Sequence, residues 1–131
     1  MILEKDPICF NHNLETVERL QKEVRRGANY KKSLSLLKKS KDIAPHIQTK
    51  SGIMLGLGEK LDEIKNTIYD LKKIDCDQIT IGQYLRPSLN HLAVKKYWEP
   101  SEFDYLYRFS KKLGFKKVSS GPLVRSSYHA G

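Results

Sequence analysis

Cysteine is scarce in this chain, with two residues in 131, Cys9 and Cys76. They lie far apart and match no spacing that is typical of a metal site, so we expect two reduced, mostly packed thiols. Long apolar runs are also lacking, because none approaches the eighteen or more residues that a membrane span needs. The opening residues lack the apolar stretch of a signal peptide. We therefore expect a soluble intracellular protein, cytoplasmic or, in a eukaryote, in an organellar matrix, with no membrane partner.

Acidic residues are outnumbered, with 24 Lys and Arg against 15 Asp and Glu and a net charge of +9. The excess lies mostly in seven dispersed doublets: Arg25-Arg26, Lys31-Lys32, Lys38-Lys39, Lys72-Lys73, Lys95-Lys96, Lys111-Lys112 and Lys116-Lys117. Such doublets usually form solvated helix faces, although a net charge of this size also attracts anionic partners. A nucleic-acid surface would need the doublets on one side with aromatic residues between them. A basic nucleic-acid-binding α/β module is therefore the alternative hypothesis.

Strand-like and helical segments alternate along the chain, whose length suits one domain with a modest core. Residues 8–10 predict a strand, and Asn13 is placed to cap an amphipathic helix that Gly27 ends. A second helix is expected from near Asn29 to just before Pro45, because the residue before a proline avoids helical backbone.

The same strand–helix unit then recurs. Residues 48–55 predict a strand, residues 56–59 a turn, and Leu61, Ile64, Ile68 and Leu71 mark one face of a helix. Residues 78–84 predict the third strand, Ser101 with Asp104 resembles a capping box, Gly114 ends the last helix, and residues 118–124 are weakly strand-like. Strands separated by helices predict an α/β fold with a parallel sheet and right-handed crossovers.

A sheet made of three βα units is buried on both faces only if further protein covers its edges. We therefore interpret the chain as a segment of a larger α/β barrel. Chemistry in such barrels lies at the C-terminal ends of the strands. Three groups fall there: residues 11–15, 56–59 and 83–87. They suit either ligand contact or ordinary caps and tight turns, since a glycine pattern alone is weak. Lys50 within a strand also calls for a partner or a ligand, because an inward ammonium needs one.

Residues 121–130 bring together a Gly-Pro turn, two apolar residues and then a run of reactive groups. Arg125, Ser126, Ser127, Tyr128 and His129 follow one another directly. An ordinary surface tail is one interpretation, since chain ends are ordered only where something ties them down. A functional segment is the other.

Four blocks carry a resemblance to a known family: FNHNLETV at residues 10–17, KSGIMLGLGE at 50–59, IGQYLRPS at 81–88 and GPLVRSSYHA at 121–130. In order and spacing they resemble four successive blocks of the lipoyl synthases, which are radical S-adenosylmethionine enzymes. The resemblance spans essentially the whole chain and implies roughly the last two-fifths of such an enzyme. Residues 1–131 would then be the C-terminal part of a partial parallel (β/α) barrel, its last three βα units, with residues 115–131 as a tail.

The resemblance implies an activity. These enzymes insert two sulfur atoms at C6 and C8 of a protein-bound octanoyl-lysine and so form the lipoyl cofactor. They cleave S-adenosylmethionine at one 4Fe-4S cluster to generate a radical, and an auxiliary 4Fe-4S cluster gives up the sulfur. Their partners are octanoylated lipoyl-carrier protein domains.

The resemblance also implies roles for individual residues. The S-adenosylmethionine site would involve Asn11, Asn13, Glu15, Lys50, Gly56, Gly58, Glu59, Gln83 and Tyr84. Ser127 would be the oxygen ligand of one auxiliary-cluster iron, a harder and weaker match for iron than thiolate. Ser126 is the fallback ligand, and Arg125 would hold the ligand or offset cluster charge. Arg86, Asn90 and His91 receive no role.

Both cysteine motifs of the family, the CxxxCxxC motif and the three-cysteine auxiliary motif, are missing from these 131 residues. The chain by itself should therefore bind neither cluster and be inactive. We expect a truncated gene product, a split gene or a fragment that depends on the missing N-terminal half of the enzyme. A catalytically dead fragment, folded or not, is a further hypothesis.

Overall fold

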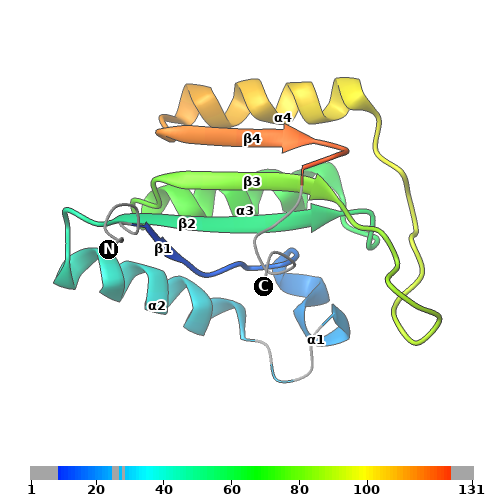
Figure 1. Cartoon of the computed structure of the whole chain (residues 1–131), viewed down its shortest axis with the longest axis horizontal. Coiled ribbons are helices and arrows are strands. Elements are labelled where there is room, and N and C mark those ends of the chain that lie inside the picture. The colour runs from blue at the N-terminus through cyan, green and yellow to red at the C-terminus, as the bar shows by residue number, and fades with distance from the viewer. Residues whose placement is uncertain (1–8, 25–26, 28, 125–131) are drawn as a thin grey trace, which may run out of the picture.

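The computed structural model describes residues 9–24, 27 and 29–124 of the chain. Its elements are β1 (Cys9–Asn11), the 3-10 helix η2 (Glu18–Leu20), α1 (Gln21–Val24), α2 (Tyr30–Ile43), β2 (Gln48–Leu55), α3 (Leu61–Lys73), β3 (Gln78–Gln83), α4 (Pro100–Leu113) and β4 (Lys117–Gly121). In Figure 1 the four strands run in one direction, with α3 behind the sheet and α4 beside β4.

The sheet is parallel and its strand order, β1-β2-β3-β4, follows the sequence. With this order, right-handed crossovers place all the connecting helices on one side of the sheet, as in a (β/α) barrel. The predicted α/β fold and the partial barrel are thereby confirmed. The sequence suggested a weak strand at residues 118–124, within the tail expected at 115–131; the structure has a fourth strand at Lys117–Gly121, paired with β3.

The two faces of the sheet differ in chemistry. Register pairs Ile53 with Ile81 and Ser51 with Ile79, so these side chains share the face that the helices cover. They are almost fully buried, together with Ile64, Ile68 and Leu71 of α3 and Phe103 and Leu106 of α4. Burial of each large apolar side chain stabilises the fold by about 1.5–3 kcal/mol before entropy is counted.

The opposite face, here called the inner face, is polar and rich in glycine. The residues that alternate onto it are Cys9, Asn11, Gln48, Lys50, Gly52, Met54, Gln78, Thr80, Gly82, Lys117, Ser119 and Gly121. After β4 the chain turns through a hydrogen bond from Val124 N–H to the Gly121 carbonyl at 3.1 Å. This turn brings the Val124 carbonyl so close to Gly82 that a Cβ there would overlap it.

Helix ends follow the sequence, with one correction. Asn29 caps α2 by accepting a hydrogen bond from Lys32 N–H at 2.9 Å, as expected. The capping box expected at Ser101 and Asp104 is wrong, because Pro100 already occupies the first position of α4. Proline suits that position, since its missing N–H would have no partner there. Instead, the Glu102 carboxylate accepts from Glu99 N–H at 2.8 Å.

The segment after β1 departs from the prediction. Asn13 caps no helix, because helical backbone begins only at Glu18. Until then the chain stays beside β2: Glu15 N–H donates to the Gly52 carbonyl at 3.0 Å, and Met54 N–H donates to the Glu15 carbonyl at 2.8 Å. Leu14 and Val17, whose spacing suggested the first part of the helix, are buried by a bent extended segment, and Leu20 is buried in η2, where helical backbone has begun.

Candidate functional site

A cavity of about 520 Å³ opens at the C-terminal ends of the strands. In Figure 1 this is the end toward which the arrows point, where α1 and the long connection between β3 and α4 lie. The cavity is lined by Glu15, Glu23, Val24, Met54, Leu57, Tyr84, Pro87, Asn90, His91 and Leu92. Its size is that of a small-molecule site, and its wall combines apolar side chains with a few polar groups. It therefore lies where barrel enzymes hold their ligands.

Two of the expected binding residues, Glu15 and Tyr84, lie in this cavity wall. Glu15 has a positive φ of 75°, which is rare outside glycine and marks a sharply bent backbone. Glu23, at the end of α1, adds a second carboxylate. Tyr84 donates its hydroxyl to the Leu92 carbonyl at 2.6 Å and so ties the end of β3 to the connection that follows. The cavity thus offers carboxylates and apolar surface side by side.

One wall of the cavity is made by residues 85–97, here called the covering loop. Arg86 folds the loop on itself by donating to the Leu89 and His91 carbonyls, both at 3.0 Å. Ser88 Oγ lies 2.8 Å from His91 Nδ1 and accepts from Asn90 N–H at 3.2 Å. Sequence reasoning gave Asn90 and His91 no role, and the structure places both in the cavity wall.

The glycine-rich turn after β2 is shaped by packing within the protein. Gly56 has a φ of 114°, and a Cβ on it would overlap the Gln83 amide and lie 2.6 Å from the Lys96 carbonyl oxygen. The Gly56 carbonyl accepts from Lys95 N–H at 2.7 Å. Gly58 also has a positive φ, 110°, but only the Lys95 side chain is near, at 3.5 Å. The space that Gly56 leaves is therefore filled by the covering loop and by Gln83.

Three buried side chains, here called the loop clamp, hold the end of the covering loop: Glu59, Gln83 and Trp98. The Glu59 carboxylate accepts from Gly56 N–H at 2.8 Å, from Leu57 N–H at 3.0 Å and from the Trp98 indole N–H at 2.8 Å. Gln83 accepts from Trp98 N–H at 2.9 Å and donates to the Lys96 carbonyl at 3.0 Å. Glu59 and Gln83, which were expected to contact a ligand, thus use their polar atoms in hydrogen bonds within the protein.

The other three expected residues, Asn11, Asn13 and Lys50, lie toward the inner face instead of in the cavity wall. Lys50 pairs in register with Asn11 and with Gln78, the first residue of β3. Five residues separate it from the end of β2, roughly 16 Å at the usual rise of a strand. Asn13 Oδ1 is buried beside Gly52 and has no hydrogen-bond partner among the described residues.

The two cysteines behave differently. Cys76 is buried and its thiol lies near the Thr49 and Gln78 carbonyls, while burial raises its pKa to about 11. Cys9 is exposed, so the expectation of packed thiols is confirmed for Cys76 and wrong for Cys9. Within the described ranges, no three His, Cys, Asp or Glu side chains gather closely enough to hold a metal ion.

A buried carboxylate also organises the opposite end of the sheet. Asp77, just before β3, accepts from Lys41 Nζ at 2.7 Å and from Thr49 N–H at 2.8 Å. Lys116 Nζ lies 3.4 Å from its other oxygen. Burial alone would raise the pKa of the Asp77 carboxyl, but these partners outweigh it and hold the pKa below its ordinary 3.8. This cluster joins α2, β2 and the approach to β4.

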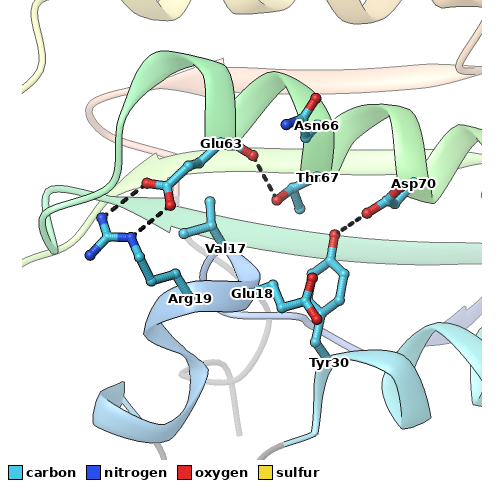
Figure 2. A pocket seen from close by; sticks show the side chains of 8 residues that line it. All are labelled: Val17, Glu18, Arg19, Tyr30, Glu63, Asn66, Thr67 and Asp70. Atoms are coloured by element: carbon cyan, nitrogen blue, oxygen red, sulfur yellow. Dashed lines mark hydrogen bonds and ion pairs between the residues drawn. The ribbon is translucent and has the colours of Figure 1, made fainter.

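A second cavity, of about 330 Å³, lies between η2, the start of α2 and α3 (Figure 2). Its polar groups contact one another: Arg19 pairs with Glu63 at 2.7 Å, and Tyr30 donates to Asp70 at 2.7 Å. Burial raises the Tyr30 pKa, and the bond to Asp70 adds to this, so the phenol stays protonated. We interpret this cavity as a seam between helices, distant from the ends of the strands.

Comparison with known proteins agrees with this geometry. Lipoyl synthase 2 of Prochlorococcus marinus subsp. pastoris is 80% identical over 130 residues, which cover 99% of this chain and 44% of that protein. The chain matches the C-terminal portion of lipoyl synthases. Lipoyl synthase 2 of a Nostoc species is 56% identical over 131 residues, and the lipoyl synthase of Thioalkalivibrio sulfidiphilus is 53% identical over 127 residues. These alignments cover 44% and 40% of the two proteins. No family model matches the sequence.

The chain thus spans 40% to 44% of the length of the three lipoyl synthases named above. The recognition made from the four sequence blocks is confirmed. The segment with Arg125, Ser126 and Ser127 lies outside the described residues, so the expected iron ligand stays a prediction. No described helix has both the length and the apolar character that crossing a membrane requires.

Nothing observed favours the nucleic-acid alternative. The six basic doublets within the described residues are spread over different parts of the chain, and several members are paired with carboxylates, such as Lys38 with Asp42 at 3.4 Å and Lys96 with Glu102 at 3.2 Å. Lys96 Nζ also lies 3.8 Å from the centre of the Trp98 ring.

Proposed function

We propose that this chain is the C-terminal part of a lipoyl synthase and builds one side of its S-adenosylmethionine site. The enzyme inserts two sulfur atoms at C6 and C8 of an octanoyl-lysine on a lipoyl-carrier protein domain. The observation that carries the proposal is the cavity at the C-terminal strand ends, in a chain 80% identical over 130 residues to a lipoyl synthase. We place the activity in the cytoplasm.

The residues of the cavity suit S-adenosylmethionine. Its sulfonium and ammonium are positive, and Glu15 and Glu23 bring two carboxylates to the same cavity. Met54, Leu57 and Leu92 offer apolar surface for a base. Outside the cavity wall, on the inner face, Asn13 Oδ1 beside Gly52 is a buried acceptor that a ligand donor can satisfy. When bound, S-adenosylmethionine supplies the radical chemistry; these side chains orient it and keep water away.

The two 4Fe-4S clusters need ligands from outside this sequence. Only two cysteines are present, and Cys76 is a buried, protonated thiol that suits packing. The cysteine-bearing part must therefore be supplied by other residues, on the same or another polypeptide. The proposed contribution of this chain to the auxiliary cluster is Ser127, with Ser126 as fallback and Arg125 beside it.

The test is a chimera in which this chain replaces the matching 44% of the Prochlorococcus relative. We expect the chimera, with reconstituted clusters, to convert an octanoylated carrier domain to the lipoyl form, measured by mass spectrometry. The 131-residue chain alone should give no product and no stoichiometric cluster. A chimera that folds and holds both clusters yet forms neither deoxyadenosine nor lipoyl product would contradict the proposal.

Ser127 is tested in the same chimera. Ser127→Ala should leave deoxyadenosine formation largely intact and lower lipoyl product, because S-adenosylmethionine is cleaved at the other cluster. Ser127→Cys should also slow sulfur insertion, because thiolate holds iron more tightly. Ser126→Ala is the matched control and should be milder. Loss confined to Ser126→Ala would move the assignment by one residue.

A further inference from the structure

The covering loop is held at one end by buried side chains and presents exposed side chains to the cavity in its middle. At its far end it is anchored by the buried loop clamp, in which Trp98 is 7% and Glu59 also 7% exposed. In its middle, Asn90 and His91 are exposed side chains that line the 520 Å³ cavity. Buried polar groups that are fully hydrogen-bonded fix a single geometry. The clamp therefore determines where these two side chains lie.

The hydrogen bonds inside the loop leave specific atoms for a ligand. Ser88 occupies Nδ1 of His91, and Arg86 occupies its carbonyl, so Nε2 is the ring nitrogen left for the cavity. The Asn90 N–H is used by Ser88, whereas its carboxamide lines the cavity. An imidazole and a carboxamide suit the hydroxyls and base edge of a nucleoside.

We propose that the covering loop is a recognition wall for the nucleoside part of S-adenosylmethionine, and that the loop clamp is the device that positions it. This inference rests on the proposed function. Asn90 and His91 contact the ligand, whereas Glu59 and Gln83 act at a distance, through Trp98. Two residues that the sequence resemblance placed at the ligand thus become positioning residues, and two residues without an assigned role become binding residues.

The recognition half is tested by equilibrium dialysis of S-adenosylmethionine against the chimera. His91→Ala and Asn90→Ala should each raise the dissociation constant by about tenfold, the effect of one lost hydrogen bond. Both side chains are exposed, so the urea midpoint of unfolding should not move. Unchanged dissociation constants in both variants would overturn the recognition role.

The positioning half is tested by the same substitution at two glutamates four residues apart. Glu59→Gln removes an acceptor of the clamp, while Glu63→Gln breaks the pair with Arg19 in the second cavity (Figure 2). We expect about tenfold weaker binding for Glu59→Gln and a change within about twofold for Glu63→Gln. If both variants bound S-adenosylmethionine equally weakly, the loss would be a general effect on stability, and the positioning role of the clamp would be overturned. Trp98→Phe keeps an aromatic side chain but loses the indole donor, and should weaken binding even if Glu59→Gln folds poorly.

A readout without ligand separates this inference from the proposed function. Trp98 is the single tryptophan of the 131-residue chain, so tryptophan fluorescence of that chain, measured without the fused half, reports on the clamp alone. Glu59→Gln should shift its emission to the red and increase acrylamide quenching, and Glu63→Gln should do neither. If the parent chimera does not bind S-adenosylmethionine, the proposed function fails and the recognition role falls with it. The clamp is then still decided by fluorescence, since an unaltered Trp98 in Glu59→Gln would overturn it.

Discussion

The two ends of the parallel sheet are each organised by one buried carboxylate, and the two are used differently. Asp77, at the N-terminal ends of the strands, accepts from one backbone N–H, that of Thr49, and from a lysine, Lys41, and has a second lysine, Lys116, nearby. Glu59, at the C-terminal ends, accepts from two backbone N–H groups and an indole, all of them neutral. Ion pairs tolerate a range of geometries, whereas neutral hydrogen bonds are directional. The cavity end is thus held by directional hydrogen bonds from neutral donors, whereas the opposite end is held mainly by charge.

The largest expected loss of stability comes from adding a side chain at Gly56, at the cavity end of the sheet. Gly56→Ala adds backbone strain at φ 114° and a Cβ that overlaps Gln83 and crowds the Lys96 carbonyl. We expect it to lower the free energy of unfolding by about 3 kcal/mol. Gly58→Ala is the matched control, with similar φ but an open site, and should cost about 1 kcal/mol. Urea unfolding of both variants checks this, and equal losses would mean that strain alone explains Gly56.

The next effect concerns the charge at the opposite end. Asp77→Asn removes a buried carboxylate and leaves Lys41, whose side chain is only 18% exposed, without its partner. We expect a loss of about 2 kcal/mol, less than for a fully buried pair because Asn keeps an acceptor for Thr49 N–H. Urea unfolding at neutral pH measures it. A loss within about 0.5 kcal/mol would show that the ionic cluster is not a structural element.

Acidification should abolish that difference. The folded pKa of Asp77 lies below the ordinary 3.8. A depressed carboxyl pKa contributes stability that is present above the unfolded value and lost as pH falls through the folded value. The gap in urea midpoint between parent and Asp77→Asn should therefore be full above about pH 5 and shrink below pH 3.8. A gap that does not change with pH would exclude the ionised form as its source.

The smallest effect separates the two lysines around Asp77. Lys41→Met removes the pair at 2.7 Å whose side chains are 18% and 6% exposed, and should cost about 1 kcal/mol. Lys116→Met removes a pair at 3.4 Å with a lysine side chain 63% exposed, and should change stability by less than about 0.5 kcal/mol. Thermal unfolding in low and high salt measures both. A larger loss from Lys116→Met would reverse the assignment of the ionic partner.

Local patterns predicted most of the fold. The strand at Gln48–Leu55 and the helix at Leu61–Lys73 agree with the expected residues because their periodicity and turn signals coincide. The helix expected from Asn13 begins only at Glu18, because its first residues form a bent extended segment that long-range hydrogen bonds hold beside β2; residues 18–24 are helical as expected.

The site was predicted only in part, for a similar reason. Glu15 and Tyr84 lie in the cavity because the ends of parallel strands meet at one edge. The clamp joins Glu59 to Trp98, 39 residues apart, and no local pattern pairs them. The single tryptophan just before a Glu-Pro helix start was the one available signal, since a buried indole needs an acceptor. Only a search for the acceptor of the Trp98 indole N–H would have led to the three clamp residues.

The close approach of Val124 to Gly82 has a genetic consequence. Because the overlapping atom belongs to the turn after β4, intolerance of Gly82 to side chains depends on a segment more than forty positions later in the sequence. Gly82→Ala should destabilise the fold while that turn is in place and cost little stability once residues 122–131 are deleted, a comparison made by unfolding because the deletion also removes Ser127. The deletion would then suppress the folding defect of Gly82→Ala, and a saturation library screened for folded protein would accept small residues at position 82 in the shortened chain that the full chain rejects.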